Sequence, residues 1–341
     1  METILFLAHT EDSGSLSKPT LEALTAAIEL SKATSSTLVA GLVGADFAAA
    51  AKQIGGGGVA RVLAVSGAEF GQSRYVTDAA AAEAIAHAAG VTIVMAAGTS
   101  RWSRALPGVA ARLNGRVDTH VSKVAAADGK VTIARGFYRQ RMQGTVTRAE
   151  RPWIVLIDPG NYEPWAGAAA DVKIEQVAVT PPALRTKVTG VRSASTGEQT
   201  IRPEAELLFV AGAGWTKKQA DGQAHPEDAE KLILGFLHAS KASLGGSKSL
   251  VDLSGEGQSV LRFMTHLNQV GQTGASPRHK KGLATCCHGE EPHVVGWRFI
   301  TERRAVNLNP SCGWAQGKAD VLYVADAFKV MQKVNELLGS M

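Results

Sequence analysis

Short apolar segments alternate with helix-like segments along the first half of the chain, and this alternation limits the possible folds more than any other feature. Apolar strands are expected at residues 4–8, 37–43, 62–65 and 91–96. Between and after them, the spacing of apolar side chains predicts helices over residues 18–32, 45–53, 77–88 and 102–113. Strands that alternate with helices in this way favour a parallel sheet covered on both faces.

The pattern changes after the fourth strand. Residues 120–126, 130–134 and 144–148 have the composition of successive short strands, and residues 153–157 close the run. Asp128 and Gly129, between the first two, form a typical hairpin turn sequence. We therefore expect the parallel sheet of the first half to carry an antiparallel extension.

The second half repeats the α/β pattern after a proline-rich, polar segment. A linker is predicted at 191–203, because the run 192–198 is polar and has no apolar residues to bury. Beyond it, strands are expected at 206–210, 282–287, 304–307 and 321–324, and helical runs at 226–238, at 259–267 and at the carboxyl end. The predicted fold class is α/β, with two doubly wound domains of mostly parallel sheets, at 1–190 and 204–341.

Composition excludes several classes of protein. The formal net charge is only +5 over 341 residues and the basic residues are spread out, which argues against a nucleic-acid partner. No apolar run reaches the ~20 residues of a membrane span, and the amino-terminal residues resemble a first strand rather than a signal peptide. Three cysteines, Cys286, Cys287 and Cys312, do not make a disulfide framework, so a cytoplasmic location is expected.

The stretch 269–274, with the sequence Q-V-G-Q-T-G, is the best candidate for a binding loop. Its two glycines allow a tight turn and a close approach of the backbone to a ligand. Exposed amides, the Thr273 hydroxyl and the Gln272 amide would suit a phosphate or the polar edge of a ring. An ordinary turn is equally compatible with the same six residues.

Other candidate motifs are weaker. Gly212 and Gly214 give G-x-G after a strand, but Lys217 stands where a dinucleotide fingerprint has its third glycine. The turn at 97–100 follows a strand and lacks a phosphate-loop lysine. At either position we expect no nucleotide from the motif alone.

A metal site is not expected at Cys286, Cys287, His288 and His293. Adjacent cysteines on a strand point to opposite faces, and the spacing lacks the paired C-x-x-C of structural zinc sites. A Cys–His nucleophile would need a third group to orient the histidine, and none is identifiable. These residues therefore give no reason to expect an enzyme.

The chain resembles the α subunit of electron-transfer flavoproteins over nearly its whole length. In the first half, the opening strand, the helix start K-P-T-L-E at 18–22 and the G-T-S turn at 98–100 are similar. The more specific matches follow: 269–274 fits Q-V-G-Q-[TS]-G and 305–310, A-V-N-L-N-P, fits A-[VI]-N-x-[DN]-P. Residues 324–328, V-A-D-A-F, fit V-A-D-[LI]-F except at Ala327.

The resemblance implies an electron carrier rather than an enzyme. It implies FAD in the carboxyl-terminal domain, a heterodimer with a β-type subunit, and electrons received from a partner dehydrogenase and passed to an acceptor. The cofactor contacts that it assigns here are Ser247, Lys248, Val270, Gly271, Gln272, Thr273, His288, Gly289, His293, Asn307 and Asp326.

Roles for these residues follow from the same resemblance. Gln272 and Thr273 would contact the edge of the isoalloxazine ring. Lys248 and His293 would favour negative charge on that ring, although lysine lacks the planar fork of the arginine that the family has there. Asn307 and Asp326 would contact the adenosine half, where a carboxylate is a natural partner for the ribose.

Three departures from the family pattern affect the phosphate side. Ala213 stands where the family has an arginine, and Glu290 and Glu291 bring negative charge to a segment near the pyrophosphate. Like charges that lie close together repel more strongly as solvent is excluded. A flavin-free or nucleotide-binding scaffold subunit of a dehydrogenase complex therefore remains an alternative.

Overall fold

The computed structural model describes residues 2–127, 129–138, 142–180, 183–190, 201–202, 205–247, 250, 260–265, 268–270, 279–285, 300–310 and 319–339. Contacts divide the chain into two compact units, Met1–Val191 and Arg192–Met341. Each unit is built around its own sheet, so the predicted fold class of two α/β domains is confirmed.

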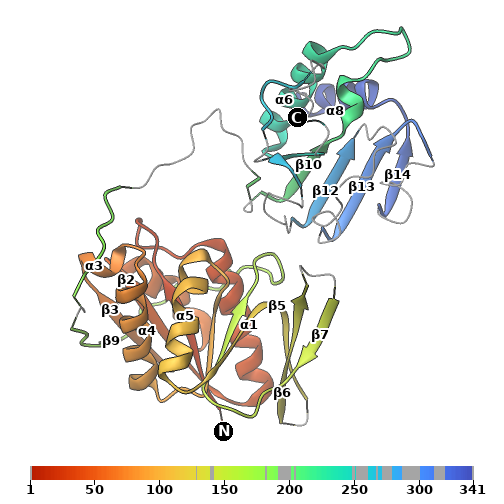
Figure 1. Ribbon diagram of the computed structural model, residues 1–341. Coiled ribbons are helices and arrows are strands. Elements are labelled where there is room, and N and C mark those ends of the chain that lie inside the picture. Colours follow the sequence, from red (N-terminus) through yellow and green to blue (C-terminus); the bar gives the residue numbers. More distant parts are fainter. Residues whose placement is uncertain are drawn as a thin grey trace. The chain divides into compact units, whose positions relative to one another are not determined.

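The first unit contains a nine-stranded sheet in the order β7-β6-β5-β8-β4-β1-β2-β3-β9 (Figure 1). From β5 through β8, β4, β1, β2 and β3 to β9 all neighbours are parallel, whereas β6 and β7 are antiparallel. The predicted antiparallel extension is therefore confirmed. The strands are β1 (Thr3–His9), β2 (Thr37–Gly44), β3 (Arg61–Ser66), β4 (Ile93–Ala97), β5 (Arg116–Ala127), β6 (Lys130–Phe137), β7 (Met142–Val146), β8 (Trp153–Ile157) and β9 (Ile174–Gln176).

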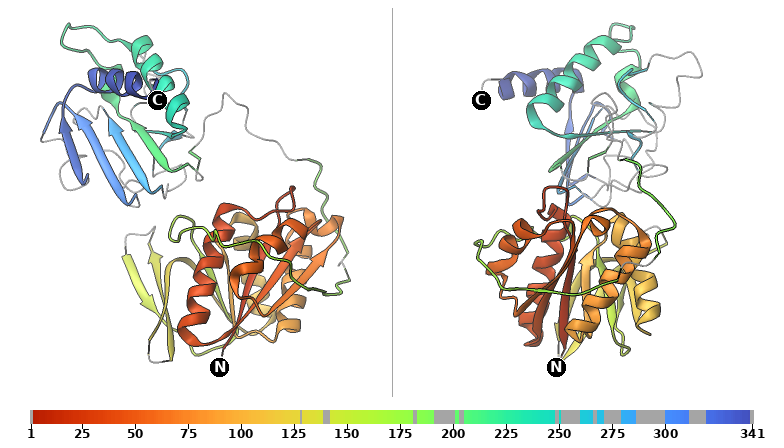
Figure 2. Two further views of the ribbon diagram at one scale, coloured as in Figure 1. Left: turned by 180° about the vertical axis from the view of Figure 1, so that it is seen from behind. Right: turned by 90° about the vertical axis from the view of Figure 1, so that its left-hand side faces the viewer.

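Helices cover both faces of this sheet (Figure 2, right). Alternate side chains of β1 enter two separate cores, with Phe6 on one face and Leu7 on the other. The core around Phe6 is covered by α1 (Lys18–Thr34) and α2 (Ala48–Ile54), which continues into η1 (Gly55–Gly57). The core around Leu7 is covered by α3 (Ala68–Gly71), α4 (Tyr75–Ala89) and α5 (Ser100–Arg112).

Besides η1, two elements of this unit were not predicted, and one is longer than expected. β9 has only three residues. It pairs in parallel with β3, and an exposed ion pair of 2.7 Å between Arg61 and Glu175 supports this pairing. α3 has only four residues. β5 begins at Arg116 rather than at residue 120, since residues 116–118 already pair with β8, and a bulge interrupts that pairing between Asp118 and Val121. Short or bulged elements leave no clear period in a sequence.

The second unit contains a five-stranded parallel sheet in the order β11-β10-β12-β13-β14 (Figure 1). Among the described residues, its helices α6 and α8 pack on one face, in a core that includes Phe209, Phe236 and Met331. The elements are β10 (Leu207–Ala211), η2 (Ala213–Thr216), α6 (Pro226–Ser240), β11 (Ser243–Gly246), β12 (Lys281–Thr285), β13 (Glu302–Asn307), β14 (Val321–Val324) and α8 (Ala327–Gly339).

One strand of this unit was not predicted, and one expectation is corrected. β11, with the sequence S-L-G-G, was not predicted as a strand, because glycine has low β propensity and only pairing with β10 makes the segment extended. The helix expected over 259–267 is wrong for its described part. Residues 260–265 form a turn in which the Met264 amide donates to the Leu261 carbonyl over 3.0 Å.

Candidate functional site

Four of the predicted cofactor residues lie within the described part of the chain, and all four are at the carboxyl edge of the second sheet. Ser247 follows β11, Asn307 ends β13, and Asp326 lies between β14 and α8. Val270 lies beside β11, since Gly246 and Gln269 form a parallel bridge. Residues from four separate stretches of sequence thus reach the same edge of the sheet.

Backbone hydrogen bonds place these residues, or their chain neighbours, in two pairs along the edge. At one side, the Ser247 amide donates to the Ala211 carbonyl over 3.0 Å, and the Val270 amide donates to the Gly246 carbonyl over 3.1 Å. At the other side, the Ala325 amide donates to the Asn307 carbonyl over 3.1 Å, which holds Asp326 next to the end of β13. The sheet order places β10 and β12 between the two pairs.

Ser247 brings a buried hydroxyl to this edge of the sheet. The residue is only 6% exposed, and its hydroxyl has no hydrogen-bond partner among the described residues. An unsatisfied buried hydroxyl costs about 1–3 kcal/mol. A ligand that hydrogen-bonds to Ser247 would remove this cost.

Val270 contributes through its backbone. Its side chain is 4% exposed and belongs to the second core of this unit, together with Leu208 and Ala284. A Cβ atom on Gly245 would lie 2.6 Å from Val270 Cγ2. The glycine of β11 therefore makes room for Val270, and the close packing brings the start of the Q-V-G-Q-T-G stretch to the edge of the sheet.

Asn307 and Asp326 each already have a structural contact. The side chain of Asn307 is buried, and its Nδ2 donates to the Asn309 carbonyl over 3.3 Å. Asp326 Oδ1 accepts from the Phe328 amide over 2.9 Å and so caps the first turn of α8. A carboxylate fixed as a helix cap next to a strand end is well placed to accept a hydrogen bond from a ligand.

A topological switch point lies between β10 and β12. The connection after β10 leads through α6 to β11, and the connection after β12 leads in the opposite direction to β13. Open α/β sheets bind ligands in the crevice at such a point, outside the carboxyl ends of the strands. The two pairs of predicted residues lie on either side of it.

The turn after β10 is held by a buried tryptophan. Trp215 is fully buried, and its indole N–H donates to Thr285 Oγ1 at the end of β12 over 2.9 Å. Ala213, at the position where the family has an arginine, is 1% exposed and begins η2. This turn therefore offers a rigid backbone and no charged side chain from Ala211 to Thr216.

Seven of the predicted contacts lie outside the described residues, as do the departures Glu290 and Glu291 and the three cysteines. They stay predictions. The seven are Lys248, Gly271, Gln272, Thr273, His288, Gly289 and His293.

A second group of polar residues, which the sequence alone did not bring together, lies at the carboxyl edge of the first sheet. His9 ends β1 and lies 3.3 Å from the hydroxyl of Thr99, which follows β4 and also caps α5 by accepting from the Trp102 amide. Burial, followed by the charge of Arg101, lowers the pKa of His9 to about 4, so this histidine is neutral at pH 7. The turn at 97–100 has a structural role as a helix cap.

Close to this group, His120 Nδ1 lies 3.3 Å from Asp158 Oδ2, and the φ angle of His120 is +57°. Positive φ is unfavourable for a residue with a Cβ atom and is here imposed by the bulge in β5. One feature of the sequence indicates this arrangement: Asp158 directly follows an apolar strand.

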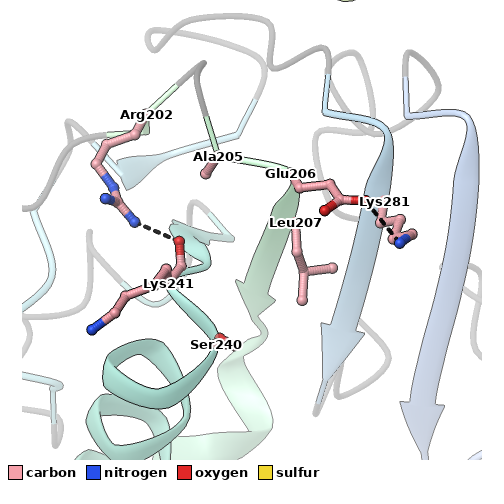
Figure 3. A pocket seen from close by; sticks show the side chains of 7 residues that line it. All are labelled: Arg202, Ala205, Glu206, Leu207, Ser240, Lys241 and Lys281. Carbon is pink, nitrogen blue, oxygen red and sulfur yellow. Dashed lines mark hydrogen bonds and ion pairs between the residues drawn. The ribbon is translucent and has the colours of Figure 1, made fainter.

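A pocket of about 530 Å³ lies at the opposite, amino edge of the second sheet (Figure 3). Its charged groups hold secondary structure together. The Arg202 guanidinium donates to the Lys241 and Ala242 carbonyls at the end of α6, and Lys281 pairs with Glu206 across β12 and β10 at 2.9 Å. The hydrogen bond from Glu206 raises the pKa of Lys281. None of the predicted cofactor residues lines this pocket.

Two further kinds of feature are absent from the described ranges. No group of three or more His, Cys, Asp or Glu side chains there is placed to hold a metal ion. The helices in that part of the chain are all too short or too polar to cross a membrane.

Comparison with protein families matches residues 4–182, just over half of the chain, to the electron transfer flavoprotein domain. The match covers the first unit up to the segment after β9. A comparison with curated proteins gives no match. Proteins of the matched family are associated with flavin and carry electrons rather than catalyse a reaction of their own. On its fold and on this match, the chain belongs to the electron transfer flavoprotein family.

Proposed function

We propose that the chain is an α-type subunit of an electron-transfer flavoprotein, which carries electrons by means of FAD bound to its second unit. The proposal assigns no bond chemistry on a substrate to the chain. FAD would lie across the carboxyl edge of the second sheet, where Ser247, Asn307 and Asp326 are found.

The observation that carries the proposal is the separation of the two residue pairs along that edge. β11 and β13 are three strand positions apart in the sheet, which corresponds to about 14 Å at the usual ~4.8 Å between strands. An extended dinucleotide can contact both pairs and cover the switch point between them. A single small ring could reach one pair only.

The residues present also fit the chemistry of FAD. The buried hydroxyl of Ser247 needs a hydrogen-bond partner, and the Val270 segment begins the glycine stretch predicted to contact the ring. At the other side, Asn307 and Asp326 offer an amide and a carboxylate, which suit ribose hydroxyls. When bound, the flavin would supply the electron-accepting chemistry, and the protein would hold it, orient it and exclude water.

Partners and location belong to the same proposal. The resemblance to α subunits supports a heterodimer with a β-type subunit, and family membership supports a dehydrogenase as the electron donor. We place the heterodimer in the cytoplasm, because three cysteines in 341 residues do not provide a disulfide framework.

Co-expression with a β-type subunit tests the proposal. The purified complex should be yellow, its flavin absorbance should bleach with dithionite, and heat extraction should release FAD in a one-to-one ratio to the α chain. A colourless complex that still assembles would instead support a flavin-free scaffold. A colourless complex that releases AMP, ADP or ATP would support a nucleotide-binding subunit.

A further inference from the structure

We propose that Lys217 supplies the positive charge for the FAD diphosphate that other members of the family obtain from an arginine in the turn after β10. The inference rests on the proposed function and identifies one residue of the binding site that neither the family match nor the motif comparison assigns.

The need for a cation follows from the turn itself. A diphosphate at the switch point would lie against the turn after β10, and the side chains from Ala211 to Thr216 carry no charge. No side chain within the turn can take over the role of that arginine. The turn is buried, and its backbone is held in place because the Gly212 amide donates to the Thr285 carbonyl over 2.8 Å. A cation that adjoins this turn is placed to supply the charge that the turn itself lacks.

Lys217 is the first ionisable residue after the turn, and its backbone is fixed there. Its amide donates to the Gly214 carbonyl over 3.3 Å. The side-chain amide of Gln219 donates both to the Gly214 carbonyl, over 3.0 Å, and to the Lys217 carbonyl, over 2.7 Å. These bonds fold the chain back on the turn, so the partly buried Lys217 stays at the carboxyl edge of the sheet.

The acidic residues nearby are engaged with other groups. Asp221 accepts from the Gln223 amide over 2.9 Å and lies 2.6 Å from His225, which is also 3.9 Å from Asp228. Lys217 itself has no ion pair among the described residues, and its neighbour Lys218 is exposed. A partly buried lysine that no carboxylate in this part of the structure neutralises is available to an anionic ligand.

The start of α6 does not compete for the diphosphate. Glu227 and Asp228 lie in its first turn, where carboxylates already satisfy the positive end of the helix dipole. These two acids would repel a phosphate from the α6 terminus. The turn after β10, with Lys217 at its end, is the better position at this edge.

The test compares two ligands that differ in the diphosphate. Apoprotein of the heterodimer is titrated with FAD and with riboflavin, and binding is measured by quenching of flavin fluorescence. Lys217→Gln should weaken FAD binding on the order of tenfold, as expected for loss of one charge-assisted hydrogen bond, and leave riboflavin binding unchanged. Lys217→Arg should keep FAD affinity near the wild-type value, and the matched control Lys218→Gln should alter neither ligand.

Two results would overturn the inference. Wild-type affinity for FAD in Lys217→Gln would show that the lysine does not contact the diphosphate. Equal weakening of FAD and riboflavin would show that the substitution disturbs the fold of the site. Both leave the proposed function standing, whereas a wild-type heterodimer that binds neither FAD nor riboflavin would remove the proposed function itself.

Discussion

The indole N–H of Trp215 donates to the hydroxyl of Thr285, and that hydroxyl donates in turn to the Val210 carbonyl over 3.2 Å. The ring of Trp215 also packs against Phe328, with 4.6 Å between the ring centroids. One buried side chain thus connects the turn after β10, the end of β12 and the first turn of α8. The first two segments lie at the switch point, and the third holds Asp326 next to the end of β14.

Replacement of Trp215 by Phe tests this connection. The smaller ring lacks the N–H and leaves a small cavity, so the second unit should lose about 2 kcal/mol of unfolding free energy. Thr285→Val removes the acceptor from the other side. In a double-mutant cycle the two changes should show a coupling of about 1 kcal/mol, because each abolishes the same hydrogen bond. Hydrogen exchange of second-unit amides gives the four free energies, and strict additivity would contradict the connection.

Ser247→Ala separates ligand binding from stability. Loss of a hydroxyl without a described partner should leave the apoprotein as stable as the wild type, or more stable by up to about 1 kcal/mol, while FAD affinity falls about tenfold. Ser243, the first residue of the strand that Ser247 follows, is the control, since its Oγ accepts from the Arg202 amide over 2.7 Å. Ser243→Ala should lower the melting temperature of the apoprotein without this loss of FAD affinity. Equal FAD affinity in Ser247→Ala and wild type would exclude Ser247 from the site.

Asp326 has two functions that can be separated by two substitutions. Asp326→Asn retains a good helix cap for α8 and loses the carboxylate, so FAD affinity should fall at nearly unchanged stability. Asp326→Ala also loses the cap and should cost about 1 kcal/mol in addition. Thermal unfolding of the apoproteins and FAD titrations measure the two effects. If the Asp326→Asn variant binds FAD as tightly as the wild type does, the carboxylate is needed only as a helix cap.

His9 should make the first unit sensitive to mild acid. Burial and the charge of Arg101 lower its pKa to about 4, against about 6.5 in the unfolded chain. As the pH falls below 6.5 the unfolded chain takes up a proton that the folded unit resists, so stability should fall by roughly 3 kcal/mol by pH 4. Urea unfolding followed by tryptophan fluorescence between pH 7 and 4 measures the loss, and in His9→Gln most of it should disappear. An equally steep profile in that variant would show that other groups are responsible.

Asp118 should make the stability of the first unit depend on pH in a more acidic range than His9 does. Burial alone would raise its pKa, but hydrogen bonds from Arg148, Trp153 and Arg135, with the arginine charges, hold the pKa of this carboxyl below its usual range. The stabilisation is therefore present above the unfolded value of about 3.9 and is lost as the pH falls through the lower folded value. Asp118→Asn should cost about 3 kcal/mol at pH 7, since it leaves the arginines without their buried partner.

The exposed pair Arg112–Glu83, at 3.1 Å, provides the comparison for Asp118. Glu83→Gln should cost less than about 1 kcal/mol, because solvent screens an ion pair at the surface. Urea unfolding of both variants at pH 7 gives the two values. Similar costs for the two substitutions would mean that the Asp118 cluster is no stronger than a surface ion pair.

The sequence alone predicted the elements with strong periodicity and the general place of the candidate site. The patterns at residues 4–8 and 18–32 predicted β1 and α1, and the sequence D-G at 128–129 predicted a hairpin before β6. Motif comparison selected Ser247, Asn307 and Asp326, although the periodicity of the chain gives no reason to place them together.

Tertiary structure decided the features that depend on contacts between residues far apart in the sequence. β11 is a strand because β10 lies beside it, and the Val270 segment lies against that strand because Gly245 leaves room for the Val270 side chain. The bulge that holds His120 at positive φ depends on the pairing of β5 with β8. Hydrophobic periodicity is a local property of the chain, whereas strand order, burial of a single hydroxyl and a lowered histidine pKa depend on contacts that exist only once the sheet has formed.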